Sequence, residues 1–420
     1  MTDVKALNLE GPDSTIPEQI KDFKTCALVS LKNIPEFQRS KMEIDIRRLD
    51  EEDSRWSYLP TLQLSSRYYV SQDEATISFQ VANFRPWEPY FTLEARILIT
   101  QIVMLKHVQA TAQSLKKLAD SFLQLIALSQ IDTHYKQIAE LYQQQLRYVE
   151  NRQESGMVTP LEVEVAKRTI ALVTAERQGN SQKRQALLNG LCIAMNLPDP
   201  KIFELDDSLV LKQIIGSEGL MALQDLSPPE NPINRQIMIK KQILQGKQIL
   251  LAYSKFMPDF SFGVRSPDVL NVSVDADKDY FFYIGMDLTL WDGNKRSRDI
   301  TRQEMLLRQM QYEKKELENN DSVEWLQATQ QYSYAKSEYA LSQSVENLNR
   351  SQLEKKQFDY DSGRIQLPDL LNHQISMHRD KINFVQKELA FNRAGLQLRY
   401  LSGQLLKDTI NISLIDIPYE

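Results

Sequence analysis

The segments ESGMVTPLEVE (residues 154–164) and DSGRIQLPDLL (residues 361–371) lie about two hundred residues apart and share one pattern. Each begins with an acidic residue, a serine and a glycine, and a carboxylate follows six residues after the glycine. The glycines are Gly156 and Gly363, and the carboxylates are Glu162 and Asp369. A chain reversal that needs positive φ is easiest at glycine. The pattern therefore predicts two turns, at about 154–162 and 361–369, each ending one helix and beginning another.

The similarity extends backwards from both turns. Residues 34–70 and 231–264 each contain a proline, a polar helix-forming stretch of about 25 residues, and a hydrophobic residue followed by proline. The second proline ends the helix because it lacks an N–H donor and disfavours the α conformation in its predecessor. The residues that follow alternate between apolar and polar, which is typical of a strand with two different faces. We therefore expect strands at about 60–70 and 258–264.

A second alternating segment follows in each half. These segments predict strands at about 88–100 and 280–291, and the latter ends in the turn signal Asp292-Gly293. The connecting stretches 71–87 and 265–278 are polar and are expected to be loops.

Two long segments, from about 101 to 153 and from about 294 to 361, contain no proline. Helices of roughly sixty residues would extend on the order of 90 Å, far beyond the average globular helix. Heptad spacing supports coiled-coil packing, although its stripes include Gln, His, Tyr and Ala. The stripes are Trp325, Ala328, Tyr332, Ala335 and Tyr339; Leu371, Ile375, His378, Ile382, Val385 and Leu389; and Ile131, His134, Ile138, Leu141, Gln145 and Tyr148. The sequence therefore predicts two long helical hairpins.

The predicted fold is mainly α with a small β part, built from two tandem repeats of helix, strand, strand and long helical hairpin. The divisions are an N-terminal extension (1–29), the first repeat (30–200), an equatorial linker (201–230), the second repeat (231–405) and a C-terminal equatorial tail (406–420). Four strands per chain are too few to close a barrel, for which about eight is the practical minimum. We therefore expect three chains to form a 12-strand β-barrel continued by a 12-helix α-barrel.

Composition and motifs argue against several other functions. The formal net charge of −6, with no cluster of Lys and Arg, argues against a nucleic-acid partner. His373 and His378 are five residues apart, which places them on different helix faces and argues against a shared metal site. Cys26 and Cys192 have no metal-type spacing and are expected to be buried thiols, with a disulfide as the alternative. We expect no enzyme activity, no cofactor and no metal.

No run of 18 apolar residues predicts a membrane-spanning helix. The N-terminal residues lack a charged region followed by an apolar region, so the sequence leaves open a cytosolic location or an export signal already removed. Aromatic residues near the predicted strand ends suggest a girdle at a bilayer interface, with ordinary cross-strand pairing as the alternative. They are Tyr68, Tyr69, Trp87, Tyr90, Phe91, Tyr280, Phe281, Phe282 and Tyr283.

The segments NPINRQIMIKKQI…FMPDFSF, YIGMDLTLWDGNKRSRDITRQE and YDSGRIQLPDLLNHQ resemble the second repeat of the TolC-like outer-membrane factors. VENRQESGMVTPLEVEVAKRTIALV resembles the corresponding part of the first repeat, and the resemblance covers about residues 30 to 410. It implies a homotrimeric channel in the outer membrane whose helical barrel crosses the periplasm. The implied partners are outer-membrane lipid, a periplasmic membrane-fusion adaptor and an inner-membrane pump or ABC transporter, in a tripartite efflux pump or a type I secretion system.

The resemblance also implies roles for residues at the hairpin tips. Glu162 and Asp369, repeated in a trimer, would place six carboxylates near one aperture, a device that favours cations. The alternative is that both acids simply stabilise the first turn of a helix. The implied gate residues are Glu162, Tyr360, Arg364, Asp369 and Asn372, where Tyr360 would bond to Glu162. The implied adaptor contacts are Gly156, Met157, Val158, Gly363, Arg364 and Ile365.

A different class of function is a soluble coiled-coil scaffold that binds partners through its long hairpins. The paired strands favour the channel, because a scaffold has no evident use for them at the same place in both repeats. A periplasmic adaptor would need a lipoyl-like β domain nested around one hairpin, and the two-fold repeat argues against that.

Overall fold

The computed structural model describes residues 20–59, 61–69, 74–85, 87–197, 199–203, 206–215, 227–229, 232–266 and 281–410. The chain divides into two compact units. We call residues 39–109 and 231–321 the sheet unit, and residues 1–38, 110–230 and 322–420 the hairpin unit. Three of the described helices contribute residues to both units.

The six longest of the described helices form three pairs of equal length, with one member from each half of the chain. The pairs are α2 (Pro35–Trp56) and α6 (Ile233–Ser254), with 22 residues each; α3 (Glu88–Glu154) and α7 (Lys295–Asp361), with 67 each; and α4 (Pro160–Ala194) and α8 (Leu367–Leu401), with 35 each. At 1.5 Å per residue the two longest extend about 100 Å. The equal lengths support the interpretation of the chain as a tandem repeat. The prediction of a mainly helical chain with a small β part is confirmed.

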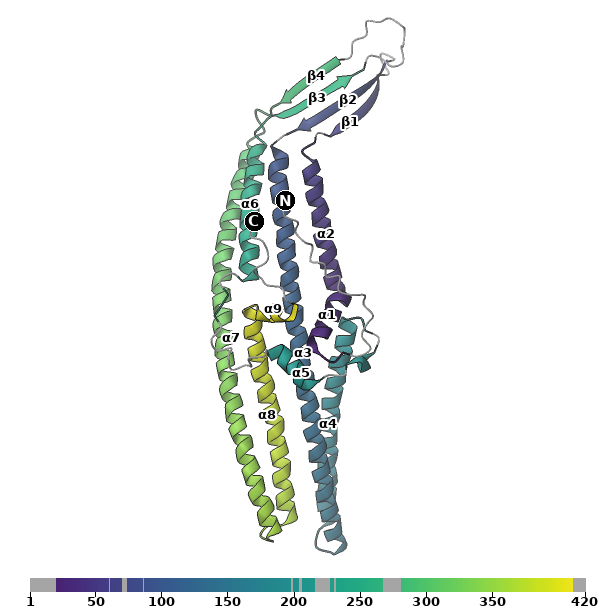
Figure 1. The fold of residues 1–420 in the computed structure, drawn as a ribbon, viewed down its shortest axis with the longest axis vertical. Coiled ribbons are helices and arrows are strands. Elements are labelled where there is room, and N and C mark those ends of the chain that lie inside the picture. The colour runs from purple at the N-terminus through teal and green to yellow at the C-terminus, as the bar shows by residue number, and fades with distance from the viewer. Residues whose placement is uncertain are drawn as a thin grey trace. The chain divides into compact units, whose positions relative to one another are not determined.

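The sheet unit contains four strands in the order β1-β2-β3-β4, all antiparallel (Figure 1). Their bounds are β1 Leu62–Tyr69, β2 Glu74–Phe84, β3 Asp259–Arg265 and β4 Phe281–Asp287. β2 pairs with β3, so the two halves of the chain meet in the middle of the sheet. β1 and β4 lie at its edges.

The strand predicted at 88–100 is wrong, because this segment is the beginning of α3. Pro89 stands in the first turn of the helix, where its missing N–H costs nothing, and the buried Ala95, Ile102 and Leu105 recur at helical rather than alternating spacing. The second strand of this half is β2, within the stretch that was expected to be a polar loop. Its apolar residues Ala75, Ile77, Phe79 and Val81 alternate regularly with polar ones, as in a strand.

One arginine, Arg85, stabilises the connection between β2 and α3. Arg85 forms an ion pair with Asp259 at the start of β3, in which Nη2 lies 2.9 Å from Oδ2. It also forms an ion pair with Glu88, the first residue of α3, at 3.3 Å. Arg85 therefore joins the end of one strand to the neighbouring strand and to the following helix.

The hairpin unit is organised around α8, which packs against both long helices. One cluster joins α8 to α3 and α4: Ala127, Ile131, Ile138, Val173, Ile375, Ile382 and Val385. A second cluster joins α8 to α7: Ala328, Tyr332, Ala335, Phe391, Ala394 and Leu398. Most of these residues belong to the heptad stripes expected from the sequence.

Short elements complete the hairpin unit. They are α1 (Phe23–Asn33), the 3-10 helix η1 (Pro200–Ile202), α5 (Asp207–Ile215) and α9 (Gln404–Ile410). Arg399 of α8, almost fully buried, donates a hydrogen bond to the backbone carbonyl of Ile214 and pairs with Asp408. This arginine therefore fastens α5 and α9 to the end of α8. The extension 1–29 and the tail 406–420 lie partly outside the described residues.

Candidate functional site

The two hairpin tips have the same backbone geometry. Gly156 and Gly363 have φ values of +69° and +72°. At the first tip the N–H of Gly156 donates to the Gln153 carbonyl at 2.8 Å, and the N–H of Met157 donates to the Arg152 carbonyl at 2.9 Å. Paired bonds of this kind around a glycine with positive φ form a Schellman motif. Both helix ends are therefore closed by their own backbones.

The second tip repeats this arrangement. Gly363 donates to the Tyr360 carbonyl at 2.9 Å, and Arg364 donates to the Asp359 carbonyl at 2.7 Å. Each following helix then has a proline at its first or second position, Pro160 or Pro368. The same local rules therefore produce the same reversal twice.

Glu162 and Asp369 occupy equivalent positions, the third residue of α4 and of α8. Both side chains are exposed. Thr159, the residue before α4, donates a hydrogen bond from Oγ1 to Glu162 at 3.3 Å. In the single chain both acids therefore lie in the first turn of a helix, where the helix dipole favours negative charge.

The other gate candidates form contacts within the hairpins. Arg364 pairs with Asp359 at 3.3 Å, so its acidic partner lies on its own hairpin. The Nε2 of Gln145 on α3 donates to Asn372 Oδ1 at 3.4 Å, which joins the two hairpins near their tips. Among the residues described for the tips, Tyr360 and Glu162 share no hydrogen bond within one chain.

The predicted adaptor contacts gather at the tips as expected from their positions in the sequence. Met157 is 68 % exposed, and both tip glycines and Arg364 are also exposed. Val158 and Ile365 are partly buried. Each tip therefore presents a glycine beside a long side chain, Met157 in one and Arg364 in the other.

One face of the sheet carries apolar side chains on all four strands, and we call it the apolar face. Strand pairing places Leu64 beside Phe79, Phe79 beside Val264, and Val264 beside Phe282. The face consists of Leu62, Leu64, Tyr68, Ile77, Phe79, Val81, Phe260, Phe262, Val264, Phe282, Ile284 and Met286. Leu64 is 65 % exposed and Ile284 is 87 % exposed, whereas Val81 is buried. An exposed apolar surface of this kind marks a site of interaction with membrane or protein.

The opposite face of the sheet is polar. The hydroxyl groups of Ser65 and Ser78 lie 2.6 Å apart, and the Tyr283 hydroxyl donates to Gln80 at 3.0 Å. The Tyr283 ring covers Gly263, where an added Cβ would lie 2.9 Å from the ring and 2.7 Å from a backbone carbonyl. The sheet therefore has an apolar side, on which Ser66 also lies, and a largely polar side.

The aromatic residues that the sequence predicts as a girdle at the bilayer interface lie in different elements and on different faces of the sheet. Tyr68 and Phe282 belong to the apolar face, but Tyr283 lies on the polar face. Tyr90 and Phe91 lie in the first turn of α3 rather than in a strand, and Trp87 precedes that helix and packs edge-on against Phe260, with ring centroids 5.9 Å apart. Tyr69 and Phe281 belong to strands, but their side chains, and all of Tyr280, lie outside the described residues.

Two histidines meet in the seam between α3 and α8, which the sequence did not reveal. The rings of His134 and His378 lie 5.5 Å apart between centroids. Burial, and then the nearby His134 and Lys381, lower the pKa of His378 to about 4. Burial also lowers the pKa of His134. Both residues belong to heptad stripes in the sequence. A stripe alone does not show which other stripe it packs against, so their contact could not be predicted.

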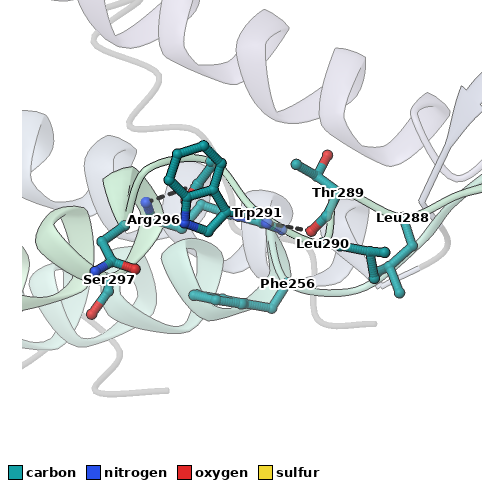
Figure 2. Close-up of a pocket in the computed structure, with 9 residues that line it drawn as sticks. Phe256, Leu288, Thr289, Leu290, Trp291, Arg296 and Ser297 are labelled. Carbon is teal, nitrogen blue, oxygen red and sulfur yellow. Dashed lines mark hydrogen bonds and ion pairs between the residues drawn. The ribbon is translucent and has the colours of Figure 1, made fainter.

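A pocket of about 260 Å³ lies at the turn before α7 (Figure 2). Asp292 caps this helix by accepting hydrogen bonds from the N–H groups of Lys295 and Arg296 at 3.1 and 3.0 Å. Arg296 contacts Asp292, donates to the Lys255 carbonyl at 2.9 Å, and lies 4.8 Å from the Phe256 ring centroid. The two charged residues of this pocket, Asp292 and Arg296, therefore stabilise the turn before α7.

Within the described part of the chain, no cluster of three or more His, Cys, Asp or Glu side chains could hold a metal ion. No described helix is both long enough and apolar enough to cross a membrane.

The two strand pairs form one sheet, and the two long hairpins pack around α8. Solved structures of outer-membrane channels have a similar fold. A membrane protein from Pseudomonas aeruginosa is similar with a TM-score of 0.72 and 15 % identity, covering 94 % of this chain and 98 % of that one. The Campylobacter jejuni CmeC outer-membrane channel gives 0.71 and 12 %, covering 98 % and 95 %.

The Neisseria gonorrhoeae MtrE outer-membrane channel, crystallised in its open state, gives a TM-score of 0.72 and 12 % identity, covering 94 % of both chains. No family model and no curated protein matches the chain by sequence. At these identities the likeness concerns the fold. The expected resemblance to the TolC-like outer-membrane factors is confirmed at that level over nearly the whole chain.

Proposed function

We propose that this chain is one subunit of a homotrimeric channel in the outer membrane, with its helical barrel in the periplasm. The channel exports small molecules or polypeptides and works with a periplasmic adaptor and an inner-membrane pump or ABC transporter. It catalyses no reaction. The fold shared with CmeC and MtrE, which are outer-membrane channels, supports this proposal.

The observation that carries the proposal is the sheet with an exposed apolar face and two edge strands. The exposed edges of β1 and β4 present backbone groups that invite pairing with another chain. Three copies supply twelve strands, which exceeds the practical minimum of about eight for closure. Closure joins β4 of one copy to β1 of the next and turns the apolar face outward to lipid.

The outer surfaces of two helices support association in the hairpin unit. An exposed apolar stripe on α7 consists of Leu326, Tyr334, Leu341, Val345 and Leu348. The exposed stripe on α4 combines large and small residues: Leu161, Val165, Leu172, Ala175 and Ala186. Large side chains on one helix fit spaces above small ones on another. We therefore assign the contact between subunits to α7 and α4.

In the trimer, the hairpin tips form the periplasmic entrance and the surface that the adaptor contacts. Three copies of Glu162 and Asp369 place six carboxylates around the periplasmic entrance, where a ring of acids favours cations. Tyr360, Arg364 and Asn372, which lie near the second tip, complete the gate. The exposed tip residues from Gly156 to Val158 and from Gly363 to Ile365 form the surface that the adaptor contacts.

Two neighbouring residues on opposite faces of β1 test the proposed function. Leu64→Lys places a charge on the lipid side and should abolish membrane-inserted trimers, because a cation at mid-membrane costs about 2–4 kcal/mol per chain. Gln63→Lys places the same charge on the polar face and should retain them. The measurement combines the mass of the detergent-solubilised protein with ion conductance across planar bilayers. A monomeric wild-type protein without conductance would support the scaffold function instead.

The acids of the entrance are tested separately from insertion. Asp369→Asn should lower the preference for cations over anions, because it removes three of the six carboxylates from the trimer. Glu164→Gln is the matched control, since Glu164 is paired with Arg168 at 3.0 Å and lies two residues from Glu162. The readout is the reversal potential in a salt gradient. Equal selectivity of the two variants would refute the role of Asp369 in ion selectivity without contradicting the channel function.

A further inference from the structure

A layer of two histidines interrupts the apolar seam between the two hairpins. The rings of His134 on α3 and His378 on α8 lie 5.5 Å apart between centroids, at an interplanar angle of 37°. In each helix, buried isoleucines stand three residues before the histidine and four residues after it. These four belong to the cluster that joins α8 to α3 and α4: Ile131, Ile138, Ile375 and Ile382. The two rings therefore occupy a layer of the seam in which an apolar pair would ordinarily pack.

The ring nitrogens of this layer are poorly satisfied. The Nδ1 atom of His378 is buried and has no hydrogen-bond partner among the described residues. The Nδ1 atom of His134 lies 3.4 Å from Gln137 Oε1, which is longer than an ordinary hydrogen bond. A buried polar atom without a partner lowers stability. Separation of the two helices would give these nitrogens access to water, which offsets part of the packing that is lost.

The charged groups around the layer disfavour added protons. Besides burial, Lys381 of α8 lowers the pKa of both rings, and Glu346 of α7 acts in the opposite direction on the pKa of His134. Lys136 of α3 is exposed. The other charged side chains within two residues of either histidine have contacts of their own: Asp132 with Arg177 of α4, Asp380 with Asn349 of α7, and Arg379 with Tyr142 of α3. Two protonated rings would therefore repel each other and Lys381.

The polar links between α3 and α8 differ on the two sides of the layer. Away from the tips, Arg393 of α8 donates to both carboxylate oxygens of Asp120 of α3, at 2.6 and 3.0 Å. Bidentate pairs of this kind are among the strong hydrogen bonds of proteins. Towards the tips, the links are longer and lie between exposed groups: Gln145 with Asn372 at 3.4 Å and Arg379 with Tyr142 at 3.3 Å. Separation of the layer is therefore expected to spread towards the tips.

We propose that the layer of His134 and His378 is an acid-sensitive switch, in which protonation of both rings separates residues 367–382 of α8 from α3. Charged imidazoles prefer water to a layer of isoleucines, so the separated form binds more protons than the packed form. The packed form is therefore favoured at neutral pH and is lost as the pH falls from 6.5 towards 4. The consequence for transport rests on the proposed function: separation near the tips would widen the periplasmic entrance of the trimer in acid.

The direct test is hydrogen exchange of the detergent-solubilised full-length protein, measured by mass spectrometry. All proteins are compared at pH 7 and at pH 5, so the intrinsic effect of pH on exchange is common to them. Between these pH values, exchange in residues 367–382 should increase about fivefold more in the wild-type protein than in His378→Leu. His134→Leu should reproduce His378→Leu, and Ser376→Leu, at an exposed position of α8, should behave as the wild-type protein.

The position of the change is part of the test. Exchange in residues 386–400, on the side of the ion pair between Arg393 and Asp120, should differ little among these proteins. Equal exchange of the wild-type protein and His378→Leu at pH 5 would overturn the proposal. An increase that extends equally over residues 367–382 and 386–400 would also overturn it, because the whole helix would then be opening.

Conductance across planar bilayers tests the consequence for the entrance. The open fraction of the wild-type channel should rise about fivefold from pH 7 to pH 5 and fall again at pH 7, whereas that of His378→Leu should change less. A disulfide across the seam, formed in the double variant Gln145→Cys and Asn372→Cys, should abolish the rise until it is reduced. A rise of equal size in His378→Leu would overturn the proposal. Absence of conductance at both pH values, together with the expected exchange, would support the switch and contradict the channel function.

Discussion

Replacing His378 by leucine should remove a pH dependence of stability from the seam between α3 and α8. Burial and His134 lower the pKa of His378 from 6.5 to about 4 in the folded protein. Since the folded-state pKa is lowered, the packed seam is fully stable above pH 6.5 and loses stability as the pH falls towards 4. By linkage, a shift of this size removes about 2 kcal/mol per chain between pH 7 and pH 5. Solvent screening at the partly exposed ring reduces this to about 1 kcal/mol.

The assay is urea unfolding followed by far-UV circular dichroism at pH 7 and pH 5, at one protein concentration. The wild-type protein should lose about 1 kcal/mol more than His378→Leu between the two pH values. Ser376→Leu is the matched control, because Ser376 is exposed on the same helix and leaves the histidine pair intact. It should lose as much as the wild-type protein. If His378→Leu retains the full wild-type pH dependence, the assignment of that dependence to the histidine pair is wrong.

Three further substitutions test the packing of the two units. Gly363→Ala should cost about 1 kcal/mol, because its φ of +72° strains any residue with a Cβ; a urea midpoint equal to that of the wild-type protein would contradict the turn geometry. Gly263→Ala should push the Tyr283 ring away and lower the thermal midpoint of the sheet, and the double variant with Tyr283→Ala should recover part of the loss. Tyr332→Ala should cost about 3 kcal/mol in urea unfolding, since the ring is 2 % exposed and packs against Phe391 with centroids 5.4 Å apart; a loss below about 1 kcal/mol would show that the cluster collapses around the gap.

The features that the sequence predicts well are those decided by local rules. Gly156 and Gly363 mark turns because glycine tolerates positive φ, and the structure has helices ending at Glu154 and Asp361. The strand expected at 88–100 fails because a short apolar run fits both periods, and only the continuous pattern beyond residue 100 shows that it belongs to a helix.

Features that depend on distant residues could not be predicted in the same way. The contact of His134 with His378 depends on which heptad stripe faces which, and several pairings satisfy the same pattern. The position of Tyr283 on the polar face depends on strand register, in which a shift of one residue exchanges the two faces. The roles of Glu162 and Asp369 remain predictions, because they depend on copies of the chain.

The equal lengths of α3 and α7, and of α4 and α8, have a consequence for how this protein can evolve. Insertion of a single heptad into one hairpin would carry its end about 10 Å past the other. Under the proposed function, an adaptor would then meet hairpin tips that end at different levels. Growth or shortening is therefore tolerated only when four helices change together by whole heptads, so we expect natural length variants to come in matched steps in both halves of the gene.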